Sequence, residues 1–206
     1  RHTDATFLSD PDWPEHGLTV FWGASLMLAP ERLLHWGFSE WGPTDNPHQT
    51  FDPRDPGLTR ERLAYYRRIA MLGSTGCSID LTDLPEWVAK ELARHNRFYA
   101  EVMARFVRTG DLRRLTGQPG RNGTGDRWAA FQYSIGTEHL IAAFRLDGGE
   151  PDRTLHPLAL DPDRPYTVTA LDAGTTERRT GADLMRDGLT CSLAPQTCEI
   201  LRLDGE

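Results

Sequence analysis

The chain has 206 residues, of which 38% are hydrophobic and 26% charged, values that suit a globular protein with a hydrophobic core. Its formal net charge of −7 argues against nucleic acid as a partner, because phosphate binding needs a basic surface. No apolar run approaches the roughly eighteen residues of a membrane helix, so we expect no membrane partner. The three cysteines, Cys77, Cys191 and Cys198, contain no C-x-x-C pair. We expect free thiols and a cytoplasmic protein, with a Cys191–Cys198 disulfide as the alternative.

The first half of the sequence alternates strand and helix patterns. Apolar segments of strand length are found at residues 5–8, 33–38 and 74–79. Segments with helical length or spacing are found at residues 17–28, 60–72 and 84–109. Thr59 is expected to cap the second helix and Asp83 the third, which Gly110 ends. This alternation predicts parallel strands joined by helical crossovers.

The pattern changes after Gly110. Short apolar or alternating runs are found at residues 112–115, 128–135, 139–146, 166–171 and 199–203. Short strands separated by Gly, Pro and Asp predict an antiparallel sandwich. The predicted fold class is therefore α/β plus all-β, with the C-terminal strands and helices of an incomplete (β/α)8 barrel at residues 1–109 and a β-sandwich at 110–206. Three strands cannot close such a barrel, so we expect the rest of it to precede Arg1.

Acidic residues follow the predicted parallel strands, where the active sites of such barrels lie. Asp10 and Asp12 follow the first strand beside Trp13, Glu40 follows the second, and Asp80 follows the third. A carboxyl group next to an aromatic ring is partly desolvated, so its pKa rises and it can act as a general acid. The alternative is that an aspartate here only caps the helix that follows.

Tryptophans gather in the same part of the chain. Trp36 and Trp41 flank Glu40, whereas Trp22 lies within an apolar helix and is expected in the core. Aromatic faces stack on the apolar faces of sugar rings, so acidic groups among tryptophans favour a carbohydrate site. His48 lies in the long loop after the second strand, where a lone histidine either anchors the loop or contacts a ligand. No H-E-x-x-H motif or metal-ligand spacing is present, so we predict no metal and no cofactor.

Several short motifs occur in an order that is informative as a whole. In the first half they are Phe7-Leu8-Ser9-Asp10, Asn46-Pro47-His48-Gln49-Thr50, the helix from Arg67 to Gly73, and the strand from Gly73 to Asp80. In the second half they are Leu158-Ala159-Leu160-Asp161-Pro162, Tyr166, and the run from Gly181 to Leu189. This order resembles the late barrel and β-sandwich of the family 36 glycoside hydrolases, the bacterial α-galactosidases.

The resemblance implies a retaining α-glycosidase with Asp10 as its acid/base residue. Its nucleophile would lie about 5–5.5 Å from Asp10, and no segment here matches the family's K-W-D-x-N-R motif, so we expect the nucleophile upstream. The segment from Trp36 to Glu40 departs from the family's G-x-H-V-S, which leaves the identity of the sugar open. Substrate contacts are expected from Asp12, Trp13, Trp36, Glu40, Trp41 and His48.

The partners implied are an α-galactoside or related oligosaccharide, the remaining N-terminal part of the enzyme, and further copies of the chain in a homo-oligomer. Two other functions stay open. One is a glycosyl-transferring relative with the same site, and the other is a non-catalytic carbohydrate-binding or structural module in which Asp10 is only a cap. An acidic nucleophile on an upstream strand would distinguish an enzyme from such a module.

Overall fold

The computed structural model of the protein describes residues 4–8, 14–39, 53–120 and 124–206. The chain divides into two compact units, Arg1–Arg108 and Thr109–Glu206. The first holds a small parallel sheet with helices, and the second is built on a six-stranded antiparallel sheet. Among the described residues, no helix combines the length and the apolar character that a membrane span requires.

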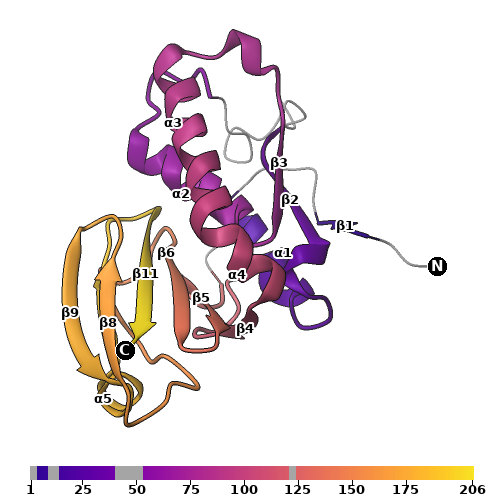
Figure 1. Ribbon diagram of the computed structural model, residues 1–206. Coiled ribbons are helices and arrows are strands. Elements are labelled where there is room, and N and C mark those ends of the chain that lie inside the picture. The colour runs from indigo at the N-terminus through magenta and orange to yellow at the C-terminus, as the bar shows by residue number, and fades with distance from the viewer. Residues whose placement is uncertain (1–3, 9–13, 40–52, 121–123) are drawn as a thin grey trace. The chain divides into compact units, whose positions relative to one another are not determined.

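Three parallel strands form the sheet of the first unit (Figure 1). They are β1 (Thr6–Phe7), β2 (Leu33–Ser39) and β3 (Ser74–Ser78), with β2 in the middle. All three were expected from their short apolar patterns, and the structure confirms them. Since the strands are parallel, their carboxyl ends lie at one edge of the sheet.

Helical segments connect and follow these strands. They are α1 (Pro14–Ala24), η1 (Pro30–Arg32), α2 (Arg60–Ala70), η2 (Leu81–Asp83), α3 (Glu86–Phe98), the π-helical η3 (Tyr99–Met103) and α4 (Ala104–Thr109). The last α-helix ends at Thr109, in agreement with the stop expected at Gly110. Helix α1 ends at Ala24, four residues before the predicted end, and Trp22 on it is half-buried, not in the core as expected.

Thr59 caps α2 as predicted, since its side chain accepts a hydrogen bond from the backbone N–H of Arg62. The expected cap of α3 by Asp83 is wrong. The N-cap residue of α3 is Pro85, which makes no side-chain cap bond. Asp83 ends η2 instead, and its carboxylate lies 3.3 Å from the guanidinium of Arg54.

Helices α1 and α2 pack on the same face of the sheet, where they cover the buried side chain of His35. Gly17 of α1 permits this approach, because a Cβ atom there would lie 3.2 Å from Ile69 of α2 and 3.6 Å from the His35 ring. Phe21 packs edge-on against the same ring, with centroids 5.9 Å apart. A second cluster, built from Leu58, Leu63, Val88 and Leu92, joins α2 to α3.

The second unit contains a six-stranded sheet in the order β4-β5-β6-β11-β8-β9, with all neighbours antiparallel (Figure 1). Its strands are β4 (Asp111–Arg114), β5 (Trp128–Ile135), β6 (Glu138–Arg145), β8 (Pro165–Ala170), β9 (Thr175–Thr180) and β11 (Thr197–Gly205). A two-stranded ribbon of β7 (Asp152–Leu155) and β10 (Leu189–Ser192), together with α5 (Gly181–Asp187), shares one buried core with this sheet.

Five strands of this unit were predicted from the sequence, whereas β7, β9, β10 and α5 were not. Strand β9 is a sheet edge and its residues are exposed apart from half-buried Arg179, so it shows no apolar alternation. Both Cys191 and Cys198 are free, as is Cys77. The expectation of free thiols is therefore confirmed, and the disulfide alternative is not.

A buried amide holds the loop before β8 in place. The fully buried side chain of Gln132 accepts a hydrogen bond from the N–H of Leu158 at 2.8 Å and donates one to its carbonyl at 2.7 Å. The hydroxyl of Tyr166 accepts a further bond from the backbone N–H of Asp161. Between these two anchors Ala159 has a φ of 54°, in the left-handed region that favours glycine.

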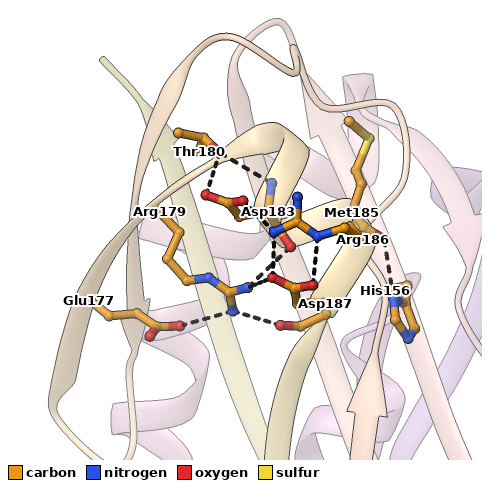
Figure 2. Close-up of polar contacts among 9 residues, drawn as sticks. His156, Glu177, Arg179, Thr180, Asp183, Met185, Arg186 and Asp187 are labelled. Carbon is orange, nitrogen blue, oxygen red and sulfur yellow. Dashed lines mark hydrogen bonds and ion pairs between the residues drawn. The ribbon is translucent and has the colours of Figure 1, made fainter.

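Helix α5 is held at both ends by polar side chains (Figure 2). Thr180 accepts a hydrogen bond from the N–H of Asp183 at the start of the helix. At its end Arg179 donates to the carbonyl of Gly188 at 2.7 Å and to that of Asp183 at 3.1 Å. Gly188 has a φ of 75°, a conformation that glycine adopts readily. The positive φ explains the glycine at position 188 of the motif at residues 181–189.

Replacing Ala159 by glycine should stabilise the second unit. The change relieves the left-handed strain of a residue with a Cβ atom, which outweighs the greater freedom of glycine in the unfolded chain. We expect the free energy of unfolding to rise by about 1 kcal/mol, measured by urea denaturation.

Ala182→Gly, in the first turn of α5, is the matched control. The backbone of Ala182 is helical, so the same substitution should lower the free energy of unfolding by roughly 0.5–1 kcal/mol. A loss of stability in Ala159→Gly as large as that in the control would contradict the strain at Ala159.

Candidate active site

Among the predicted site residues, Trp36 alone lies in the part of the chain that the structure describes. The others lie outside the described residues and remain predictions: Asp10, Asp12, Trp13, Glu40, Trp41 and His48. Two described strands end shortly before predicted site residues in the sequence. Strand β1 ends at Phe7 and β2 at Ser39, and the two strands are parallel neighbours.

The ring of Trp36 lies on the sheet face opposite the helices. Side chains alternate along β2, so Leu34 and Trp36 face away from buried His35. Trp36 is half-buried, and its ring centroid lies 5.7 Å from that of Phe7 on β1. A Cβ atom at Gly76 of β3 would lie only 2.4 Å from the Trp36 ring. The indole therefore rests directly on the backbone of β3, which only glycine permits.

A buried guanidinium lies on the other face of the sheet from the Trp36 ring. Arg67 of α2 is 3% exposed. Its Nη1 donates to the hydroxyl of Thr75 at 2.8 Å and to the carbonyl of Gly76 at 3.3 Å. Its Nη2 donates to the side-chain oxygen of Asn96 on α3 at 2.8 Å. Burial removes water from the guanidinium and lowers the pKa of Arg67, although Cys77 and Tyr99 act in the opposite direction.

The strand register changes where Arg67 meets the sheet. Trp36 pairs with Gly76 and Ser39 with Ser78, so β2 carries one residue more than β3 between these pairs. A Cβ atom at Gly37 would lie 2.2 Å from Nη1 of Arg67. The guanidinium thus takes the space that a side chain at residue 37 would fill. Such bulges occur often next to active sites, where they redirect the end of a strand.

Two other titratable groups belong to this part of the sheet, His35 within β2 and Asp80 after β3. Burial lowers the pKa of His35 to about 4, although the backbone of Ile69 acts in the opposite direction. His35 is therefore a neutral core residue at pH 7. Asp80 after β3 caps the turn that follows, since its Oδ1 accepts bonds from the N–H and the hydroxyl of Thr82. These bonds lower its pKa, which excludes it as a general acid near neutral pH.

Comparison with known proteins identifies this arrangement by its three-dimensional structure. No protein-family model matches the sequence, and no curated protein sequence does either. The family 36 α-galactosidase AgaB from Geobacillus stearothermophilus matches 97% of the chain with a TM-score of 0.74 and 21% identity. The chain has the fold of part of a family 36 glycoside hydrolase.

Two further structures agree. A variant of the family 36 α-galactosidase AgaA from Geobacillus stearothermophilus, in complex with raffinose, matches 94% of the chain with a TM-score of 0.71 and 20% identity. The α-galactosidase from Lactobacillus brevis matches 96% with a TM-score of 0.67 and 16% identity. In each comparison the chain spans about a quarter of the family 36 structure, between 24% and 25%.

The buried Arg67 was not predicted as a site residue from the sequence. Arg67 was noted only as the start of a helical motif, and an arginine on an amphipathic helix is normally solvent-exposed. The signal that accompanies it is a pair of glycines, Gly37 and Gly76, each within a predicted strand. A glycine within a strand often marks a bulge or the close approach of another group. Within the described residues, no three His, Cys, Asp or Glu side chains are grouped to hold a metal ion.

Burial of His35 makes the first unit sensitive to acid. The unfolded chain binds a proton on this residue near pH 6.5, whereas the folded chain does so only near pH 4. The free energy of unfolding therefore falls as the pH drops from 6.5 to 4, by about 3 kcal/mol from this group.

The variant His35→Leu should remove this part of the pH dependence. Denaturant titrations at pH 7 and at pH 4.5, followed by tryptophan fluorescence, measure it directly. We expect the loss of stability between the two pH values to be smaller in His35→Leu than in the wild type. An equal loss in both proteins would show that His35 is not held neutral by burial.

Proposed function

We propose that this chain is part of a retaining α-galactosidase. In this proposal residues 1–109 are the last strands and helices of a catalytic (β/α)8 barrel, and residues 110–206 form the C-terminal β-sandwich. The observation that carries the proposal is the match of 97% of the chain to a family 36 α-galactosidase at a TM-score of 0.74. The parallel sheet and the antiparallel sheet follow each other in the order that the motifs of this family predict.

The free face of the parallel sheet supports the barrel. Parallel sheets are covered on both faces, and here α1 and α2 cover one of them. On the other, Phe7 is 40% exposed and Leu34 and Trp36 are half-buried. In a barrel this face is the interior, where side chains from the remaining strands would pack against it.

The proposed reaction uses two carboxyl groups, only one of which lies in this chain. A nucleophilic carboxylate from another part of the barrel attacks the anomeric carbon while Asp10 protonates the departing oxygen. Asp10 then removes a proton from the water that releases the sugar. Terminal α-galactosyl oligosaccharides are the proposed substrates, which the raffinose complex of AgaA supports. Trp36 would provide an apolar surface for the sugar.

Replacing Asp10 by alanine in the complete protein should remove acid/base catalysis. We expect kcat for an aryl α-galactoside to fall by roughly 10²–10⁴-fold, the usual contribution of general acid–base catalysis. Azide should restore turnover, because it needs no base to attack the covalent intermediate. Two successive inversions then give α-galactosyl azide, identified by NMR.

Asp12→Ala is the matched control for this experiment, since it removes a neighbouring carboxylate that has no proton-transfer role in the proposal. It should change KM more than kcat and should not respond to azide. A wild-type protein without α-galactosidase activity, or an Asp10→Ala variant with normal kcat, would contradict the proposal. The first result would favour a non-catalytic carbohydrate-binding or structural module.

Trp36→Leu should weaken substrate binding in the same enzyme. Loss of the aromatic surface is expected to raise KM roughly tenfold with little change in kcat, because a platform contacts substrate and transition state alike. Trp22→Leu, on α1, should leave KM unchanged. Equal KM values for Trp36→Leu and the wild type would exclude Trp36 from the substrate site.

A further inference from the structure

We propose that Arg67 is a positioning residue of the candidate active site, acting through the backbone of β2 and β3 on the ring of Trp36. It does not touch the sugar. Its role in substrate binding rests on the proposed function, whereas its effect on Trp36 can be tested without it. The inference comes from three contacts of one buried guanidinium.

The first contact is with β3. Nη1 of Arg67 binds the hydroxyl of Thr75 and the carbonyl of Gly76, so the guanidinium holds two successive residues of the strand. The Trp36 ring rests on Gly76, since a Cβ atom at this residue would lie only 2.4 Å from the ring. A shift of this peptide would therefore move the surface beneath the indole.

The second contact is with β2. The guanidinium fills the place of the absent side chain at Gly37, directly beside the extra residue of the bulge. The bulge lies between Trp36 and Ser39, the end of the strand. Arg67 thus binds β3 at Thr75 and Gly76 and packs against β2 at Gly37, where the bulge begins. We infer that these contacts set the direction in which both strands reach the edge.

The third contact orients the guanidinium. Asn96 of α3 accepts a hydrogen bond from Nη2 at 2.8 Å, which fixes the plane of the group. The hydrogen-bond acceptors of Arg67 in the described part of the chain are all neutral, and its Nε has none there. A buried cation without a carboxylate is costly, so packing alone does not account for an arginine here. Its planar fork reaches several acceptors at once, which lysine cannot do.

The neighbouring Arg68 provides a matched control. It is equally buried, at 4% exposure, and follows Arg67 on the same helix. Its guanidinium lies over the ring of Phe98, 5.3 Å from the centroid, on α3. A substitution of Arg68 therefore perturbs a buried arginine of α2 without removing the contacts to Thr75 and Gly76.

The direct test is ¹⁹F NMR of the complete protein labelled with 5-fluorotryptophan. The Trp36 signal is identified by its loss in Trp36→Phe. We expect Arg67→Met and Gly37→Ala each to shift or broaden this signal, and Arg68→Met to leave it in place. Since the Cβ of Gly37→Ala acts by displacing Nη1, adding it to Arg67→Met should have little further effect.

The functional test is the kinetics of α-galactoside hydrolysis by the same variants. Arg67→Lys keeps the charge but loses the fork, so we expect KM to rise roughly tenfold while kcat changes much less. Arg68→Lys should change KM much less than Arg67→Lys does. A general loss of folded enzyme would lower the apparent kcat and leave KM unchanged, which separates positioning from simple destabilisation.

The outcomes are distinguishable. An unmoved Trp36 signal in Arg67→Met overturns the proposal, whatever the activity. A moved signal with unchanged KM in an active enzyme also overturns it, because the ring would then not serve the substrate. A moved signal in a wild-type protein that hydrolyses no α-galactoside supports the structural role of Arg67 and contradicts the proposed function alone.

Discussion

The candidate site depends on one buried cation that joins two parallel strands to two helices. Arg67 holds β3 through Thr75 and Gly76 and holds α3 through Asn96. Two glycines make this possible from opposite sides of the sheet, because Gly37 leaves room for the guanidinium and Gly76 leaves room for the Trp36 ring. The edge of the sheet is therefore fixed by polar contacts behind it, while its free face stays apolar.

The second unit is built on a different principle. Its sheet, ribbon and short helix share one apolar core, and polar side chains serve mainly to hold the segments between strands. Gln132 binds both the N–H and the carbonyl of Leu158, and Arg179 donates to the carbonyl of Gly188 at the end of α5. The carboxylate of Glu199 accepts the backbone N–H groups of Asp172 and Ala173 in the turn between β8 and β9. Within the motifs that resemble family 36, Tyr166 binds the backbone of Asp161, and Gly188 takes the positive φ at the end of α5.

Sequence patterns predicted the parallel strands and the long helices because burial on one face leaves a clear period. They missed β9, whose edge position removes the need for apolar residues, and they assigned Asp83 as a cap where Pro85 occupies that position. For the site, Trp36 was predicted from its neighbours in sequence, and its contact with a sugar stays a prediction. The role of Arg67 could not be found in this way, since its partners lie between 8 and 29 positions further along the chain.

The stereochemistry of hydrolysis tests the central claim most directly. The complete protein is mixed with an aryl α-galactoside, and the anomeric proton of the released sugar is followed by ¹H NMR before mutarotation. A retaining mechanism, with Asp10 serving in both steps, predicts that α-galactose appears first and β-galactose only later. Release of β-galactose first would show an inverting mechanism, and no release of galactose would show that this fold serves another function here.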